Sequence, residues 1–158
     1  MTFNYTVKTQ KNIDDAIAEI TTKLSEIQFG VLGTLDFKEI FAKKGVDYPH
    51  QYKLLEVCNP QAAKQALDSD PNIGLLLPCT IAVYEKDGQN YLSLAKPTEL
   101  LSVASNAELE SMGKEIETKL IKIIDDVKWL ILSLKSKGFS FCLTQIIYHS
   151  WVILLRHD

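Results

Sequence analysis

Two cysteines stand at the ends of neighbouring apolar segments, and thiols can carry out redox chemistry, hold soft metals or act as nucleophiles. Cys58 ends the segment LLEVC, and Cys79 follows the segment LLLP and begins the next one. If these segments pair as antiparallel strands, both sulfurs lie at the same end of the sheet. Cys58, Asn59 and Cys79 are therefore the candidate ligand-binding or redox residues.

The residue types leave three interpretations of the two cysteines open. A functional thiol pair requires a lowered thiol pKa, and a helix that begins at Pro60 would bring its positive N-terminus close to Cys58. Free cysteines are also among the most buried residues and pack as small apolar groups. A disulfide is the third interpretation, although a reducing compartment disfavours it.

A metal site is a further alternative. Zinc sites in proteins use three or four ligands, and His50 is the only histidine that precedes residue 129. Cys58, Cys79 and His50 would form an incomplete set that suits a soft ion such as zinc or copper. Asn59 is explained most simply as the N-cap of the helix that begins at Pro60.

Motifs for catalysis are missing from the sequence. No serine lies in a Gly-x-Ser-x-Gly motif, and the glycines at positions 30 and 33 lack the following helix that a phosphate-binding loop requires. The carboxylates show no pairing typical of acid-base catalysis. The sequence therefore favours a module that binds a small ligand or a protein partner over an enzyme, and it names no cofactor.

Composition indicates one cytoplasmic domain. The chain has 158 residues, of which 46% are hydrophobic, enough for an ordinary core. Its formal net charge is −3 and the basic residues form no stripe, so we expect no nucleic-acid binding. The first residues do not resemble a signal peptide, which predicts synthesis in the cytosol.

Hydrophobic periodicity predicts an α+β fold. Helical spacing indicates long helices over residues 12–27 and 105–127, with shorter helices after Phe37 and Pro60. Asp87-Gly88 is suited to a tight hairpin turn between the last two strands. The order β-α-β-β-β-β-α, with short connections, indicates a curved, mostly antiparallel sheet with both long helices on one face. Alternation predicts the strands at residues 3–7, 31–37, 52–58, 78–85 and 91–95.

The second face of such a sheet needs either water or a partner. Apolar residues in the central strands make free exposure unfavourable, so we expect a symmetric homodimer through this face, with a small ligand as a further partner. The residues that we assign to this face are Leu32, Thr34, Leu55, Val57, Ala82 and Tyr84.

Residues 129–158 form an apolar C-terminal extension of a different character. The stretch that begins at Phe139 and ends at Leu155 carries no formal charge. As a helix it would span about 25 Å, somewhat less than a bilayer requires. A folded extension, a membrane tail and a frame-shifted end are the alternatives, and the membrane tail would make the chain a tethered interaction protein.

Several motifs together resemble the bacterial and archaeal domain-of-unknown-function 302 family over residues 1–128. They are VLGTLDF at 31–37, KGVD at 44–47, LEVCNP at 55–60, GLLLPC at 74–79 and VYE at 83–85. The resemblance implies a fold similar to that of the TATA-binding protein, and it implies a dimer. It does not imply DNA binding, because function depends on sites and this chain is acidic.

Overall fold

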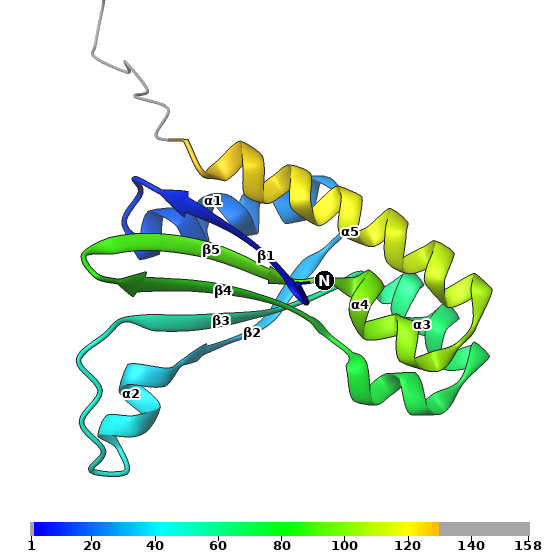
Figure 1. The fold of residues 1–158 in the computed structure, drawn as a ribbon, viewed down its shortest axis with the longest axis horizontal. Helices are drawn as coiled ribbons and strands as arrows, with labels where there is room; N and C mark the ends of the chain where they lie inside the picture. Colours follow the sequence, from blue (N-terminus) through cyan, green and yellow to red (C-terminus); the bar gives the residue numbers. More distant parts are fainter. Residues whose placement is uncertain (1, 130–158) are drawn as a thin grey trace, which may run out of the picture.

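The computed structural model describes residues 2–129 and has an α+β fold around one five-stranded sheet (Figure 1). All neighbouring strands are antiparallel, in the order β1-β5-β4-β3-β2. The predicted fold class, with an antiparallel sheet and two long helices on one face, is confirmed. The strands are β1 (Asn4–Thr9), β2 (Gly30–Asp36), β3 (Tyr52–Cys58), β4 (Cys79–Lys86) and β5 (Gln89–Ala95).

The two long helices, α1 (Ile13–Glu26) and α5 (Ala107–Val127), pack against each other on that face (Figure 1). Each begins after an asparagine that caps it. The Oδ1 atom of Asn12 accepts the backbone N–H of Asp15 at 2.8 Å, and that of Asn106 accepts the N–H of Glu108 at 2.9 Å. These bonds satisfy amides that the helix itself leaves unpaired, so the caps fix where the helices start.

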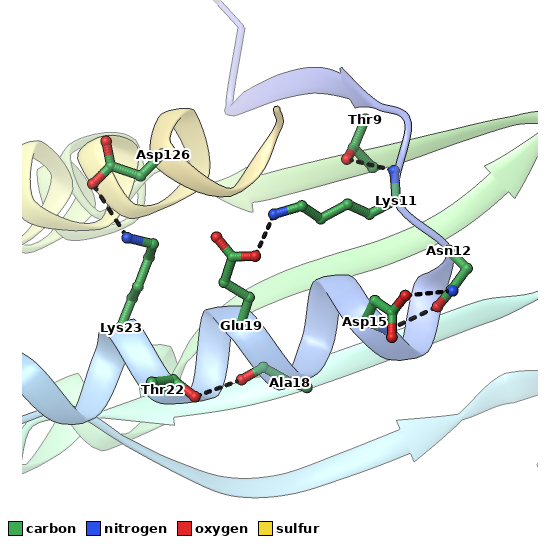
Figure 2. Close-up of polar contacts among 9 residues, drawn as sticks. All are labelled: Thr9, Lys11, Asn12, Asp15, Ala18, Glu19, Thr22, Lys23 and Asp126. Atoms are coloured by element: carbon green, nitrogen blue, oxygen red, sulfur yellow. Dashed lines mark hydrogen bonds and ion pairs between the residues drawn. The ribbon is translucent and has the colours of Figure 1, made fainter. Parts of the chain in front are cut away.

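Polar contacts hold α1 to the rest of the fold (Figure 2). The side chain of Lys11, only 5% exposed, forms an ion pair with Glu19 of α1. Lys23 near the end of α1 approaches Asp126 of α5 at 3.8 Å. Because the Lys11 ammonium is almost fully withdrawn from water, its pairing with Glu19 matters more to stability than the exposed pair does.

The hydrophobic core lies between the sheet and these two helices. Ile20 and Leu24 of α1 and Leu120 and Ile124 of α5 are fully buried in it. Burying an aliphatic side chain of this size stabilises a fold by about 1.5–3 kcal/mol relative to leaving it exposed. The strands contribute a matching layer, Leu55, Val57, Ile81, Val83, Leu92 and Leu94.

This layer corrects the sequence-based assignment of the second face. Leu55 and Val57 are fully buried toward the helices, so they do not belong to the open face. Both alternating positions of β3 carry apolar residues, which made the inward side ambiguous from the sequence. A β-bulge between Val31 and Gly33 adds to the error, because it shifts the register of β2 so that simple alternation fails there.

The open face instead carries a row of tyrosines. Tyr52, Tyr84 and Tyr91 are directly opposite one another on β3, β4 and β5. Their rings stack, with centroids 5.4 Å apart for Tyr52 and Tyr84 and 5.3 Å apart for Tyr84 and Tyr91. Ala82 also lies on this face, because its strand neighbour opposite is Leu54, the residue before the inward-facing Leu55.

The shorter helical segments are predicted only in part. The sequence predicts α2 (Phe37–Ala42) and α3 (Pro60–Ser69), whereas α4 (Pro97–Leu101) and the 3₁₀ segments η1 (Pro71–Leu76) and η2 (Ser102–Ala104) go beyond it. The hairpin turn between β4 and β5 is confirmed, because Asp87 and Gly88 both have positive φ values, 53° and 71°.

The C-terminal extension falls almost entirely outside the described residues. The stretch from Phe139 to Leu155 and its three structural alternatives therefore stay predictions. Within residues 2–129, no helix has the length and apolar character needed to cross a membrane.

Candidate ligand-binding site

Strand pairing places the two cysteines at the same end of the sheet. Cys58 is the last residue of β3, where it pairs with Gly30 of β2. Cys79 is the first residue of β4 and is directly opposite Val57. Both cysteines are half-buried and carry free thiols.

The two cysteines lie close together but are not paired across the β3 and β4 strands, because Cys79 is opposite Val57. Consecutive residues of a strand point to opposite faces, so Cys79 shares the inward face with Val57 and not with Cys58. Accordingly, Cys79 packs against the main core. A disulfide needs Cβ atoms directed toward each other, so the strand geometry favours two separate thiols.

Burial keeps both thiols protonated. It raises the pKa of Cys79 to about 11 from an ordinary 9.0, with the nearby Cys58 as a second cause. Burial also raises the pKa of Cys58. The expected activation of Cys58 by the N-terminus of α3 is therefore outweighed by the loss of hydration, because an apolar environment disfavours the charged thiolate.

Asn59 caps α3, as the sequence predicts. Its Oδ1 atom accepts the backbone N–H groups of Gln61 and Ala62, both at 3.0 Å. Pro60 occupies the first helical position, where a missing N–H costs no intrahelical bond. The cap fixes the direction of α3 at the point where the chain leaves β3, and it leaves the Nδ2 hydrogens of Asn59 for other partners.

His50 lies far from the cysteines. It precedes β3, and its ring contacts that of Tyr48, with centroids 5.6 Å apart. Cys58 ends the same strand, so the length of β3, about 20 Å, separates them. The predicted ligand set of Cys58, Cys79 and His50 is thus not brought together. Among residues 2–129, no group of three metal-ligating side chains converges.

A small cavity of about 30 Å³ lies beside the two cysteines. Its walls come from the ends of β3 and β4 and from α3, η1, α4 and α5. In the described part of the chain, no charged side chain lines it, and Asn59 offers the only amide. The lining residues are Phe29, Val57, Cys58, Asn59, Ala62, Ala63, Ala66, Leu76, Leu77, Cys79, Pro97, Leu100, Leu101, Met112 and Ile116.

The cavity lies between two separate hydrophobic clusters. The main core contributes Phe29, Val57 and Cys79 to its wall, whereas Ala66 and Leu101 belong to a smaller cluster. This smaller cluster, which we call the satellite cluster, has the buried members Ala66, Ile73, Leu101 and Leu109. A void where two clusters meet is a natural place for an apolar ligand, because such sites are concave and mostly lined by apolar groups.

The sequence patterns did not predict that α4 and α5 form a wall of the cavity. Two signals could have indicated it. Pro97 occupies the first turn of α4, as Pro60 does in α3, although Lys96 provides no side-chain cap. Gly113 lies within α5, where a Cβ would come within 3.3 Å of the Leu101 side chain and 3.4 Å of the Pro97 carbonyl oxygen. A helical glycine with such neighbours marks a close approach of another segment.

Fold and site together define an α+β module with an apolar cavity at one end of an antiparallel sheet. The family model described as "Domain of unknown function DUF302" matches residues 5–127. The chain therefore belongs to the DUF302 family. This description names no activity, and none of the curated proteins matches the chain.

A solved relative has the same fold. The crystal structure of an uncharacterized conserved DUF302 protein from Bacillus stearothermophilus matches with a TM-score of 0.76 and 31% sequence identity. The match covers 79% of this chain and 98% of that chain. The two chains therefore share the same fold over most of their lengths.

Proposed function

We propose that this protein is a homodimeric module that binds a small, uncharged, mostly apolar molecule in the cavity beside Cys58, Asn59 and Cys79, without catalysis. The uncharged lining of the cavity carries the proposal. A charged ligand would lose its hydration there without gaining an ionic partner, which is costly. The Nδ2 group of Asn59 can bind one acceptor atom of the ligand at the rim.

The state of the thiols favours binding over the redox alternative. A redox or soft-metal protein that uses Cys58 and Cys79 needs accessible thiolates, whereas burial raises the pKa of both groups. As a neutral thiol on the inward face, Cys79 acts as a small polarisable contact for an apolar ligand. Free thiols also support the proposal that the protein works in the cytosol, where cysteines stay reduced.

Benzene is a suitable probe for the cavity, because dry apolar cavities in proteins bind it. We expect saturable chemical-shift changes at the methyl group of Met112 when benzene is titrated into the full chain. Ala63→Leu should fill the cavity and weaken binding at least about tenfold, whereas Ala18→Leu, on the exposed side of α1, should not. Unsaturable shifts, or equal binding by both variants, would exclude this function.

The open face of the sheet supports the proposed homodimer. Tyr52, Tyr84 and Tyr91 form an aromatic row across its three middle strands, and Ala82 and Leu54 beside them add no charge. A second copy related by a two-fold axis brings the same patch against itself, so an uncharged patch avoids repulsion. Aromatic residues of this kind are enriched in interfaces.

Sedimentation velocity tests the dimer. The full chain should sediment as a dimer at micromolar concentration, and Tyr84→Lys should shift it to a monomer, because it would put a lysine of each copy into the interface. Lys122→Glu, on the exposed face of α5, is the matched control and should leave the dimer intact. A monomeric wild-type chain, or a dimer that persists in Tyr84→Lys, contradicts the interface.

A further inference from the structure

The cavity is too small for the ligand class that its lining selects. An apolar cavity that takes up benzene in a protein has a volume of about 150 Å³. The cavity beside Cys79 offers about 30 Å³, roughly the space of a water molecule. A ligand of even modest size therefore requires one of the walls to move.

The wall made by α3 and η1 is weakly attached to the rest of the fold. Ala66 is the only fully buried residue of α3, and Ile73 is the only one of η1. By comparison, α5 has six buried residues. A segment that buries so little apolar surface contributes little to stability and belongs to the parts of a protein that open locally.

The same segment is packed well within itself. Leu67 of α3 lies against Gly74 of η1, where a Cβ would come within 3.1 Å of the leucine side chain. Asp70 joins the two helices, because its side chain accepts the backbone N–H of Asn72 at 2.9 Å. Residues 60–76 can thus move as one unit without losing their internal contacts.

The opposite wall is fixed. Pro97 and Leu101 of α4 pack so closely on Gly113 of α5 that there is little room for a side chain between them. The side chain of Glu117 accepts the backbone N–H of Thr98 at 3.0 Å, which ties the start of α4 to α5. Movement of α4 would disrupt these contacts, so the mobile wall is the one made by residues 60–76.

Two exposed side-chain contacts tie residues 60–76 to the first turn of α5 and its N-cap. Gln65 donates a hydrogen bond to Glu108 at 2.9 Å, and Asn106 donates one to Ser69 at 3.2 Å. Exposed polar contacts contribute little to stability because water competes for the same groups. They can hold a closed position without making it permanent.

We propose that residues 60–76 form a lid that pivots at Asn59 and Leu77 and opens the cavity to an apolar ligand. This inference rests on the proposed function, because it describes how that same cavity is filled. Opening separates Ala66 and Ile73 from Leu101 and enlarges the space beside Cys79. Closing over the ligand restores the satellite cluster and adds the ligand to it.

The thiol of Cys79 reports on the lid without any ligand. Methyl methanethiosulfonate converts an accessible thiol into a methyl disulfide and releases methanesulfinate. Its rate of reaction at Cys79, resolved by peptide mass spectrometry, measures how often the cavity opens. We expect the double variant Gln65→Ala, Ser69→Ala to react about threefold faster than wild type, the factor that two exposed polar contacts supply.

Glu115→Ala is the matched control, because it removes an exposed contact to Lys119 within α5 that does not involve the lid. The control should react at the wild-type rate. Global stability, measured by urea unfolding, separates lid opening from whole-chain unfolding. The lid would be overturned if Cys79 reacted at equal rates in the double variant and the control. It would also be overturned if the rate of reaction at Cys79 followed global stability in every variant.

The labelling experiment tests the lid and the benzene titration tests the proposed function, so each proposal can be refuted without the other. A lid that opens, together with no saturable binding of benzene, refutes the proposed function and leaves the motion established. Saturable benzene binding with no faster labelling of Cys79 in the double variant refutes the lid and leaves the function standing. If both hold, benzene should also protect Cys79 from the reagent in proportion to occupancy.

Discussion

Cys79 should make the stability of this fold sensitive to alkaline pH. Burial raises the pKa of its thiol to about 11, whereas the unfolded chain ionises near the ordinary 9.0. Between these values the unfolded state has released the proton and the folded state has kept it. The free energy of unfolding therefore falls as pH rises through this window, and it is unaffected by this thiol below about pH 8.

The size of the effect follows from the difference of two pKa units. Each unit corresponds to about 1.4 kcal/mol, so the largest loss is about 3 kcal/mol, of which about 2 kcal/mol is reached by pH 11. Other groups titrate in the same range, because burial also raises the pKa values of Tyr52 and Tyr84. These tyrosines contribute equally to the free energy of unfolding of wild type and of a variant that lacks only the Cys79 thiol. Their contribution therefore cancels in the difference between the two proteins.

The assay is urea unfolding of wild type and Cys79→Ala at a series of pH values from 8 to 11, under reducing conditions. At pH 8 the variant is less stable by a constant packing cost, since its smaller side chain leaves a void. We expect this difference to shrink by about 2 kcal/mol at pH 11, because only wild type loses the thiol contribution. Parallel pH profiles for the two proteins would refute the assignment of a buried, protonated thiol to Cys79.

Three further predictions concern the anchors of the fold and the site. Glu19→Gln should destabilise the chain by about 3 kcal/mol in urea unfolding, because it leaves the buried Lys11 ammonium without a carboxylate. A cost below about 1 kcal/mol would contradict a stabilising role for the Lys11–Glu19 ion pair. Asn59→Ala should cost about 1 kcal/mol through loss of the α3 cap, whereas Asn59→Asp should retain most of the stability; equal unfolding midpoints for the two variants would show that the cap is unimportant. Iodoacetamide at pH 8 should modify Cys58 well before Cys79, because the Cys79 pKa is the higher one; equal rates in peptide mass spectrometry would contradict the difference in thiol pKa.

Most of the fold is predictable from local sequence signals. The stripes of α1 and α5, the asparagine caps and the Asp87-Gly88 turn each depend on residues close together in the chain, so the pattern alone identifies them. The inward side of β3 depends on a register with distant strands, and Leu54, Leu55 and Val57 are all apolar. Which side of β3 faces the core is therefore set by its pairing with β4 and with the bulged strand β2.

The candidate site is predictable to a lesser extent. The placement of Cys58 and Cys79 at one sheet end and the capping role of Asn59 follow from strand direction and helix chemistry. The protonation of the thiols does not, because their burial depends on side chains from α3, η1, α4 and α5 as well as from the strands. The cavity was not predicted either, since its far wall comes from residues 97–116, which are distant in the sequence from both Cys58 and Cys79.

The alanines of α3 explain why a cavity exists at this position. Ala62, Ala63 and Ala66 face it, and an alanine side chain ends at its Cβ atom. Leucines at these positions would reach across the gap toward Met112 and Ile116 and close it, with a gain in buried apolar area. Protein interiors ordinarily fill such gaps, because voids lose contacts on every side. The space beside Cys79 thus remains because three short side chains of α3 face long side chains of α5. This space is where we propose that the ligand binds.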